Sequence, residues 1–391
     1  MCPEKFWKRK DEKEGWKDDE MADLHWHIDT PEYVIRGAVI ASIPQGILPP
    51  SVFVFATWTN SGVNFSYFVS PEKDLDLDYA RRNGVSVGVR GTVTGGCSWT
   101  DKGSPGNAVG FSRNHPKCPS TLSELYRIVF TAYADAISEE YGVKTRFRPI
   151  NDIEVLCDDG VWRKFGLAGG LESSSFLAVG NSVQLTEVPW DLVDKVIVPP
   201  PEKFADKETK TLRDRSTFFN KVVGREVSFE ELEMVLKRGV EKAFNVTFIP
   251  TKIFWEDIPF YNSIKKLLTS DDWFYARTER KKFQNTPITP DVKRGEALDK
   301  IPQGPLVRVT VLVKNEKIYN ILITGSIHAA PVIPESPIDA MERELQGTPA
   351  EKAAVREKVE KIFNTESCQI MNITPEQFTK IIMKAIKAAT S

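Results

Sequence analysis

A long capped amphipathic helix is the feature that most constrains the fold of this chain. Residues 120–141 carry apolar side chains at helical spacing, and Thr121 with Glu124 forms the pattern of a capping box. Gly142 follows directly, where a left-handed residue commonly ends a helix. The pattern predicts a helix that lays one apolar face on a packed core.

Short strands with turn signals flank this helix. Residues 52–55 and 85–89 read as apolar strands, and Leu75–Asn83 reads as a helix that stops at Gly84. Asp158-Asp159-Gly160 separates two more apolar runs, at 153–157 and 161–165, and therefore predicts a β-hairpin. A further strand is expected over 176–185 and a second capped helix over 228–245.

The last part of the chain has its own pattern. Residues 306–313 and 318–323 predict a two-stranded hairpin. Three helix starts follow, each with Pro at the first helical position, at Ser336-Pro337, Thr348-Pro349 and Thr374-Pro375. Another helix start, Thr30-Pro31, lies near the beginning of the chain. The 391 residues fit two domains at roughly 100–200 residues each.

The expected fold class is α/β, in the α+β sense. We expect a polar N-terminal arm over residues 1–24, then a large domain of mixed β-sheets flanked by helices over 25–250. A small C-terminal α+β accessory domain would occupy residues 251–391.

Composition and charge exclude several classes of protein. The formal net charge of −2 provides no field for polyanions, so no nucleic-acid partner is expected. No run of 18 apolar residues occurs, so no membrane partner is expected either. The N-terminal residues carry charges where a secretory signal would need an apolar stretch, and the five cysteines have no CxxC spacing. These features predict a cytoplasmic protein.

A glycine-rich segment, residues 90–103, is the main candidate for chemistry. Gly95 and Gly96 have no Cβ, so their backbone amides can approach an anionic ligand closely, and Arg90 supplies a forked cation. The spacing matches neither a Walker loop nor a dinucleotide fingerprint. A plain surface turn beside an arginine would give the same pattern.

The surroundings of this segment resemble the lipoate–protein ligase A family of the biotin/lipoate ligase superfamily, with a divergent site. Residues 74–103, DLDLDYARRNGVSVGVRGTVTGGCSWTDKG, are similar to the stretch that lines the lipoyl-adenylate site in that family. Asn151-Asp152-Ile153 followed by Lys164 resembles the family's Asn-Asp…Lys element. Residues 201–215 and 272–283 resemble two later family segments, and the C-terminal hairpin and helices resemble the accessory domain of the bipartite ligases.

The resemblance implies an ATP-dependent ligase that joins lipoate, octanoate or another carboxylic acid to an amine through an acyl-adenylate. The amine would be a small amine or a lysine of a lipoyl-domain-like protein. The implied catalytic residues are Lys164 and Arg90, with Lys164 stabilising the developing charge. Asp152 would hold Mg²⁺. The residues implied to bind ATP share positions with the family's motifs: Thr94, Gly95, Gly96, Asp101, Asn151 and Asp152.

Several positions depart from the family pattern. Gly91 stands in place of an Arg, Thr94 in place of the first Gly of a triplet, and Thr100 in place of a His. Near residues 178–181 the family has a His-His-Gly-Thr run that this chain lacks. Losing one charge-assisted hydrogen bond removes about 1.5–3 kcal/mol. The departures therefore indicate changed chemistry, a changed acid or a lost activity.

Two other functions stay open at this point. One is an ATP-independent acyltransferase of the octanoyltransferase type, which would use Cys97 as nucleophile. The other is a non-catalytic member of the fold that binds a ligand or partner. For single residues, Lys164 could be a solvated lysine on a hairpin, and Cys97 could be a buried inert thiol.

Overall fold

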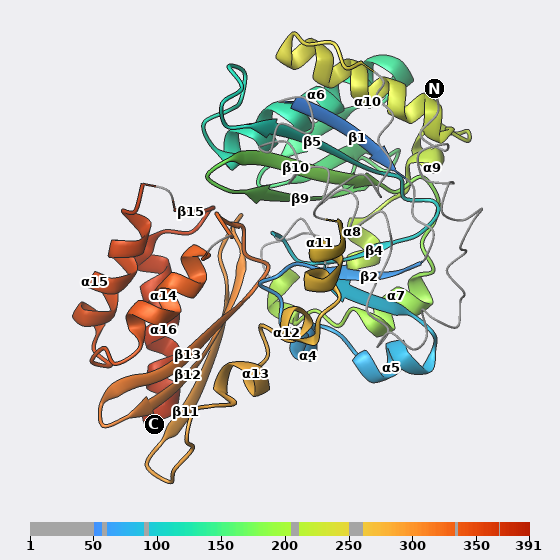
Figure 1. Cartoon of the computed structure of the whole chain (residues 1–391). Coiled ribbons are helices and arrows are strands. Elements are labelled where there is room, and N and C mark those ends of the chain that lie inside the picture. The colour runs from blue at the N-terminus through green and yellow to red at the C-terminus, as the bar shows by residue number, and fades with distance from the viewer. Residues whose placement is uncertain are drawn as a thin grey trace.

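A computed structural model describes residues 51–56, 61–89, 94–204, 211–249, 261–332, 335–366 and 368–391. Its elements form a larger unit, which carries most of the sheets, and a C-terminal unit beside it (Figure 1). The expected α/β architecture, with mixed sheets flanked by helices, is confirmed. The expected N-terminal arm (residues 1–24) and the helix start at Thr30-Pro31 lie outside the described residues.

The largest sheet has four antiparallel strands, in the order β1 (Ser51–Ala56), β5 (Gly106–Ser112), β10 (Phe176–Val183) and β9 (Gly166–Glu172). The helix α6 (Leu122–Tyr141) packs on this sheet, and α10 (Phe229–Phe244) packs on α6 (Figure 1). Gly239 permits the close approach of the two helices, because a Cβ there would lie 2.7 Å from the carbonyl oxygen of Ala132.

Two smaller three-stranded sheets complete the larger unit. In one, β2 (Gly62–Phe65) lies between β3 (Ser86–Val89) and β4 (Cys97–Thr100), parallel to the first and antiparallel to the second. The other is antiparallel and runs in the order β6 (Thr145–Arg148), β7 (Asp152–Leu156), β8 (Trp162–Lys164). The short helices α4 and α5 precede β3, and α7 follows β10: Pro71–Asp74, Leu77–Arg82 and Trp190–Val196.

Short helical segments lie on either side of α10. Before it come η2 (Pro201–Phe204), α8 (Leu212–Arg215) and α9 (Phe219–Val223), which belong to the larger unit. After it, α11 (Tyr261–Leu268), α12 (Asp271–Phe274) and α13 (Glu279–Phe283) form the connection to the C-terminal unit. Phe274 of α12 packs edge-on against Phe65 of β2, with ring centroids 5.2 Å apart. This part of the connection therefore contributes to the core of the larger unit.

The C-terminal unit is a three-stranded antiparallel sheet covered by helices. Its strands are β11 (Lys293–Lys300), β12 (Leu306–Lys314) and β13 (Lys317–Gly325). Its helices are α14, α15 and α16, at Pro337–Leu345, Lys352–Phe363 and Pro375–Thr390, and a small pair joins β14 (Ala329–Ala330) to β15 (Gln369–Ile370). A Cβ on Gly295 would lie 2.1 Å from the Ala385 carbonyl oxygen, so α16 contacts β11 directly.

Most of the predicted elements are confirmed with end shifts of a few residues. The Thr121 hydroxyl accepts the Glu124 amide at 3.1 Å, and Gly142 ends α6 in the left-handed region at φ +66°. The hairpin around Asp158-Asp159-Gly160 and the C-terminal hairpin are both present.

One predicted helix start is wrong. The pattern at Thr348-Pro349 predicted a helix, but α15 begins at Lys352 with Glu351 as its N-cap. Residues 348–350 pair instead with the turn of the β12–β13 hairpin, where the Thr348 carbonyl accepts the Ile318 amide at 2.9 Å. Tertiary pairing therefore overrides the local signal.

The two units meet through shared buried residues. Phe68, which follows β2, is fully buried within the core of the C-terminal unit, and its carbonyl accepts the Gly325 amide at 2.8 Å. Arg277 ties the connection to α14 through Glu342 and Asp339, at 2.9 and 2.5 Å.

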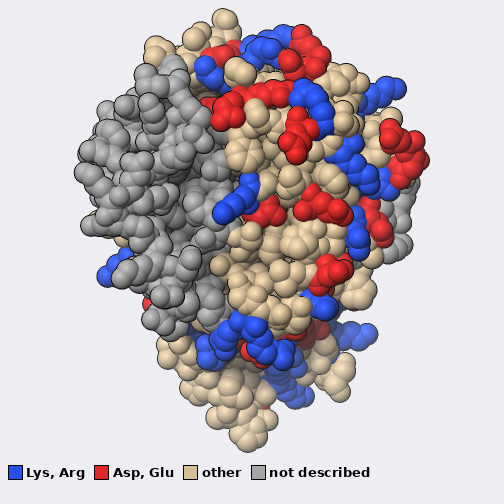
Figure 2. Space-filling model, turned by 90° about the vertical axis from the view of Figure 1, so that its right-hand side faces the viewer, with Lys and Arg blue, Asp and Glu red and all other residues tan. Residues whose placement is uncertain are grey.

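On the face shown in Figure 2, basic and acidic side chains are interspersed over much of the described surface. None of the helices in the described residues has the length and apolar character needed to cross a membrane.

Candidate functional site

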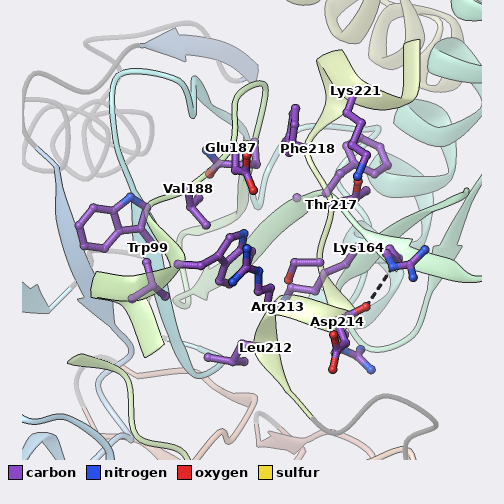
Figure 3. Close-up of a pocket in the computed structure, with 18 of the residues that line it drawn as sticks. Trp99, Lys164, Glu187, Val188, Leu212, Arg213, Asp214, Thr217, Phe218 and Lys221 are labelled. Atoms are coloured by element: carbon purple, nitrogen blue, oxygen red, sulfur yellow. Dashed lines mark hydrogen bonds between the residues drawn. The ribbon is translucent and has the colours of Figure 1, made fainter. Parts of the chain in front are cut away.

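A cavity of about 600 Å³ opens between β4, β8 and residues 187–222 (Figure 3). One part of its wall is apolar, formed by Trp99, Phe165, Val188, Trp190, Val193, Ile197, Leu212, Phe218 and Val222. The other part is charged, with more basic than acidic side chains: Arg163, Lys164, Lys203, Arg213, Arg215 and Lys221 against Asp158, Asp159, Glu187 and Asp214. Such a cavity suits a ligand with one apolar and one anionic end.

Lys164 lies at the end of β8 and reaches this cavity. Its ammonium donates to Asp152 Oδ1 at 3.3 Å, while Arg215 donates to Asp152 Oδ2 at 2.5 Å. The register of the hairpin brings β7 and β8 together, and an isolated bridge joins Lys164 to Ser216, next to Arg215. Two cations thus share one carboxylate at the cavity wall.

The protonation of these groups follows from their burial and their neighbours. Burial lowers the pKa of Lys164, and Arg215 and Lys203 lower it further, whereas Asp152 raises it. Burial acts to raise the pKa of Asp152, but Lys164 and Arg215 outweigh burial and leave that pKa lowered. Asp152 is therefore ionised at neutral pH and holds the two cations in place.

Lys203, on η2, lies beside Gly96, the second residue of the glycine pair. A Cβ built on Gly96 would lie 3.7 Å from the Lys203 ammonium and 3.5 Å from Cβ of Ser326 in the C-terminal unit. Gly96, Cys97 and Lys203 also border a small hollow beside the main cavity.

Gly95 is hydrogen-bonded to the rest of the protein, whereas Gly96 borders a hollow. The Gly95 amide donates to the Ile327 carbonyl of the C-terminal unit at 3.1 Å, and the Gly95 carbonyl accepts the Ser66 hydroxyl at 2.6 Å. The Gly95 amide is thus engaged by the protein in this conformation. Gly96 borders the small hollow beside Lys203 and Ser326. Their predicted role toward ATP stays a prediction.

Two other predicted site residues, Thr94 and Asp101, make structural hydrogen bonds. The Thr94 hydroxyl accepts the Gly170 amide and lies 2.9 Å from the Tyr126 hydroxyl. Asp101 accepts the Trp99 indole N–H at 2.8 Å and the Gly103 amide at 2.9 Å. These two residues are absent from the cavity wall.

Asn151 likewise makes a structural contact, because its side chain donates to the Ala168 carbonyl at 2.7 Å. This bond ties the start of β7 to β9. Arg90, predicted to act with Lys164, lies outside the described residues. The predicted cofactor and catalytic roles of these residues stay predictions.

Two cysteines, Cys97 on β4 and Cys157 beside the hairpin turn, line the cavity that Lys164 reaches. Each is partly exposed. Arg163 donates to Asp159 and to the Asp214 carbonyl, and it also hydrogen-bonds with Cys157. Cys97 belongs to the motif next to the glycine pair, so a thiol and the Lys164 ammonium share one cavity.

The predicted magnesium role of Asp152 stays a prediction. Both oxygens of its carboxylate already accept hydrogen bonds from cations. Among the residues that the structure describes, no three His, Cys, Asp or Glu side chains gather to form a metal site. A magnesium ion held between Asp152 and a substrate phosphate would share the carboxylate with Lys164 and Arg215.

Lys203 and Arg215 were not assigned a role from the sequence. Both lie in the 201–215 segment that resembles a family motif, so that segment contained the signal. The apolar wall from α7 and the following residues was not predicted either, because isolated Trp and Val residues give no sequence signal for a cavity.

No protein-family model matches the chain. The chain is 21% identical over 251 residues to octanoyltransferase LipM of Geobacillus kaustophilus, which is 60% of this chain and 89% of the relative. It is 26% identical over 192 residues to lipoate-protein ligase A subunit 1 of Thermoplasma acidophilum, which is 48% of this chain and 70% of that protein.

The chain is a homologue of the LipM octanoyltransferases and of lipoate-protein ligase A. Its fold agrees, because the crystal structure of P. falciparum LipL1 in complex with lipoate superposes with a TM-score of 0.63. That match covers 90% of this chain and 94% of LipL1, at 13% sequence identity. This homologue thus shares the lipoate ligase fold across both of its units, and the sequence resemblance is confirmed.

Proposed function

We propose that this protein transfers an octanoyl-type acyl group from a thioester donor to a lysine amine of an acceptor protein. One observation carries the proposal: Cys97 and Lys164 line the same cavity. The similarity to several proteins named octanoyltransferase LipM supports transfer over ATP-dependent ligation.

The reaction has two steps. The Cys97 sulfur attacks the carbonyl of the acyl thioester, the bond from carbonyl to donor sulfur breaks, and the donor thiol leaves with the proton of Cys97. The acceptor amine then attacks the acyl-Cys97 carbonyl, forms the amide, and returns a proton to the Cys97 sulfur. In both steps negative charge develops on the acyl oxygen.

Lys164 stabilises that oxygen. Its ammonium is held by Asp152, which is itself fixed by Arg215. A preorganised cation stabilises a developing oxyanion without reorganising during the reaction. The apolar wall of Trp99, Val193 and Leu212 would hold the acyl chain.

The test is transfer from octanoyl-pantetheine to a lipoyl-domain protein, with and without ATP. Transfer without ATP is expected, together with its loss in Cys97→Ser and its retention in Cys157→Ser. Cys157 is the matched control because it lines the same cavity. Full activity in Cys97→Ser would sink the transfer mechanism.

A second candidate is adenylation of a free acid, as the sequence resemblance implies. It is favoured by the cations of the cavity, because Lys164 and Arg215 share one carboxylate and Lys203 adds a further charge. Acid-dependent exchange of pyrophosphate into ATP, lost in Lys164→Ala, would support this candidate over transfer.

A further inference from the structure

Lys203 occupies the corner between the glycine pair and the main cavity. It borders both the main cavity and the small hollow, and its ammonium lies beside Gly96. It is also close enough to Lys164 to affect the titration of that residue. An anion bound in this corner would lie between two ammonium groups.

The charges of this corner are unbalanced. Lys164 and Arg215 share Asp152, whereas Lys203 forms no ion pair with any residue in the described ranges. Lys203 interacts electrostatically with the buried Asp74, but the Asp74 carboxylate already faces Arg308 of β12 at 3.7 Å. The corner therefore has spare positive charge that an anionic ligand would neutralise.

The opposite side of the cavity is apolar. Trp99 and Val188 lie across the view from Lys164 in Figure 3, and Leu212 lies near them. A ligand that satisfies both sides has one anionic oxygen group and an unbranched apolar chain. A medium-chain carboxylate has this form, and about 600 Å³ is within the usual range for a small-molecule site.

We infer that Lys203 is a substrate-binding residue that, together with Lys164, clamps the anionic oxygen of a medium-chain acyl group. The acyl chain extends from this corner along Trp99 and Leu212. This inference rests on the proposed function for the identity of the acyl group. The acyl oxygen would then contact two cations, Lys203 of η2 and Lys164 of β8.

Calorimetric titration of the full chain with octanoate tests the clamp without requiring turnover. Octanamide is the neutral ligand of the same shape. Octanoate is expected to bind about tenfold more weakly to Lys203→Gln than to the wild-type protein, because one charge-assisted contact is lost. Octanamide binding is expected to change less than twofold, and Lys203→Arg is expected to restore octanoate binding.

Lys242, which is 80% exposed on α10 and does not line the cavity, provides the control variant Lys242→Gln, in which octanoate binding is retained. Equal affinity of Lys203→Gln and the wild-type protein for octanoate overturns the inference. An equal loss of affinity for octanoate and octanamide also overturns the inference, because the substitution would then have changed the shape of the cavity and not a contact with the anionic group.

Titration with inorganic phosphate is the third binding experiment. Lys203-dependent binding of phosphate without any binding of octanoate would assign the corner to a phosphate group and overturn the carboxylate assignment. A failure of acyl transfer while octanoate still binds in the expected way would overturn the proposed function and leave the clamp in place.

Discussion

Two groups of charged side chains in this molecule differ in how completely they are paired, one buried at the junction between the units and one partly buried in the cavity. At the junction between the units, Arg277 is 2% exposed and is matched by Glu342 and Asp339, with Lys282 also donating to Glu342. In the cavity, Lys164 and Arg215 share one carboxylate, and Lys203 lacks an ion-pair partner among the described residues. The matched group stabilises the fold, and the unmatched group is available for a ligand.

The largest effect is expected at the junction. Arg277→Met would leave Glu342, whose side chain is 1% exposed, with one cation fewer and should lower the free energy of unfolding by about 3–5 kcal/mol. Urea denaturation followed by circular dichroism measures this. Arg343→Met, which removes an exposed pair with Glu335, is the control and should change stability by less than about 1 kcal/mol. Similar values for both variants would remove the distinction between the two groups.

A substitution of Lys164 tests the role of the charges in the cavity. Lys164→Gln is expected to reduce the rate of acyl transfer by about 100-fold or more, because it removes the cation that stabilises the acyl oxygen. Its melting temperature should stay near that of the wild-type protein. Lys242→Gln, at an 80% exposed lysine outside the cavity wall, should transfer at close to the wild-type rate. An unchanged rate in Lys164→Gln would count against any catalytic role of this residue.

A smaller effect is expected in the pH dependence of the transfer rate. Because burial, Arg215 and Lys203 lower the pKa of Lys164, the rate should fall on the alkaline side at a lower pH than an exposed lysine would give. Asp152 raises that pKa, so Asp152→Asn should move the alkaline limb to still lower pH, and Lys203→Gln should move it to higher pH. Rates measured from pH 6 to 10 at saturating substrate would show the direction of each shift. An alkaline limb that moves upward in Asp152→Asn would contradict this assignment.

The smallest effect is expected at a helix cap in the C-terminal unit. Thr374 and Gln377 form a capping box at the start of α16, so Thr374→Ala should cost about 1 kcal/mol of stability. Thr374→Ser keeps the hydroxyl and should be near neutral. Transfer activity should not change in either variant, which would separate a local loss of stability from the chemistry of the cavity.

The sequence predicted elements better than it predicted the cavity. Caps such as Thr121 and Thr374, and the turn at residues 158–160, act locally and so appear in the sequence. The strand β11 was missed, because its charged residues carry no strand pattern and its pairing with β12 fixes it.

At the site, the sequence pointed to Lys164 and Asp152, and the hairpin register explains why they meet. The sequence could not show that the Gly95 amide donates to the Ile327 carbonyl, or that Lys203 lies beside Gly96. Both contacts depend on how segments distant in the sequence pack together. Thr94 and Asp101 occupy motif positions but make structural bonds, so a motif position alone does not place a side chain in the cavity.

The central claim is that Cys97 and Lys164 act in one cavity on one acyl group. The most direct measurement is mass spectrometry of the protein after brief incubation with octanoyl-pantetheine in the absence of ATP and acceptor. The account predicts one octanoyl adduct, located on the Cys97 peptide and accumulating more slowly in Lys164→Gln. An adduct on another residue, or no adduct while transfer to the acceptor proceeds, would contradict it.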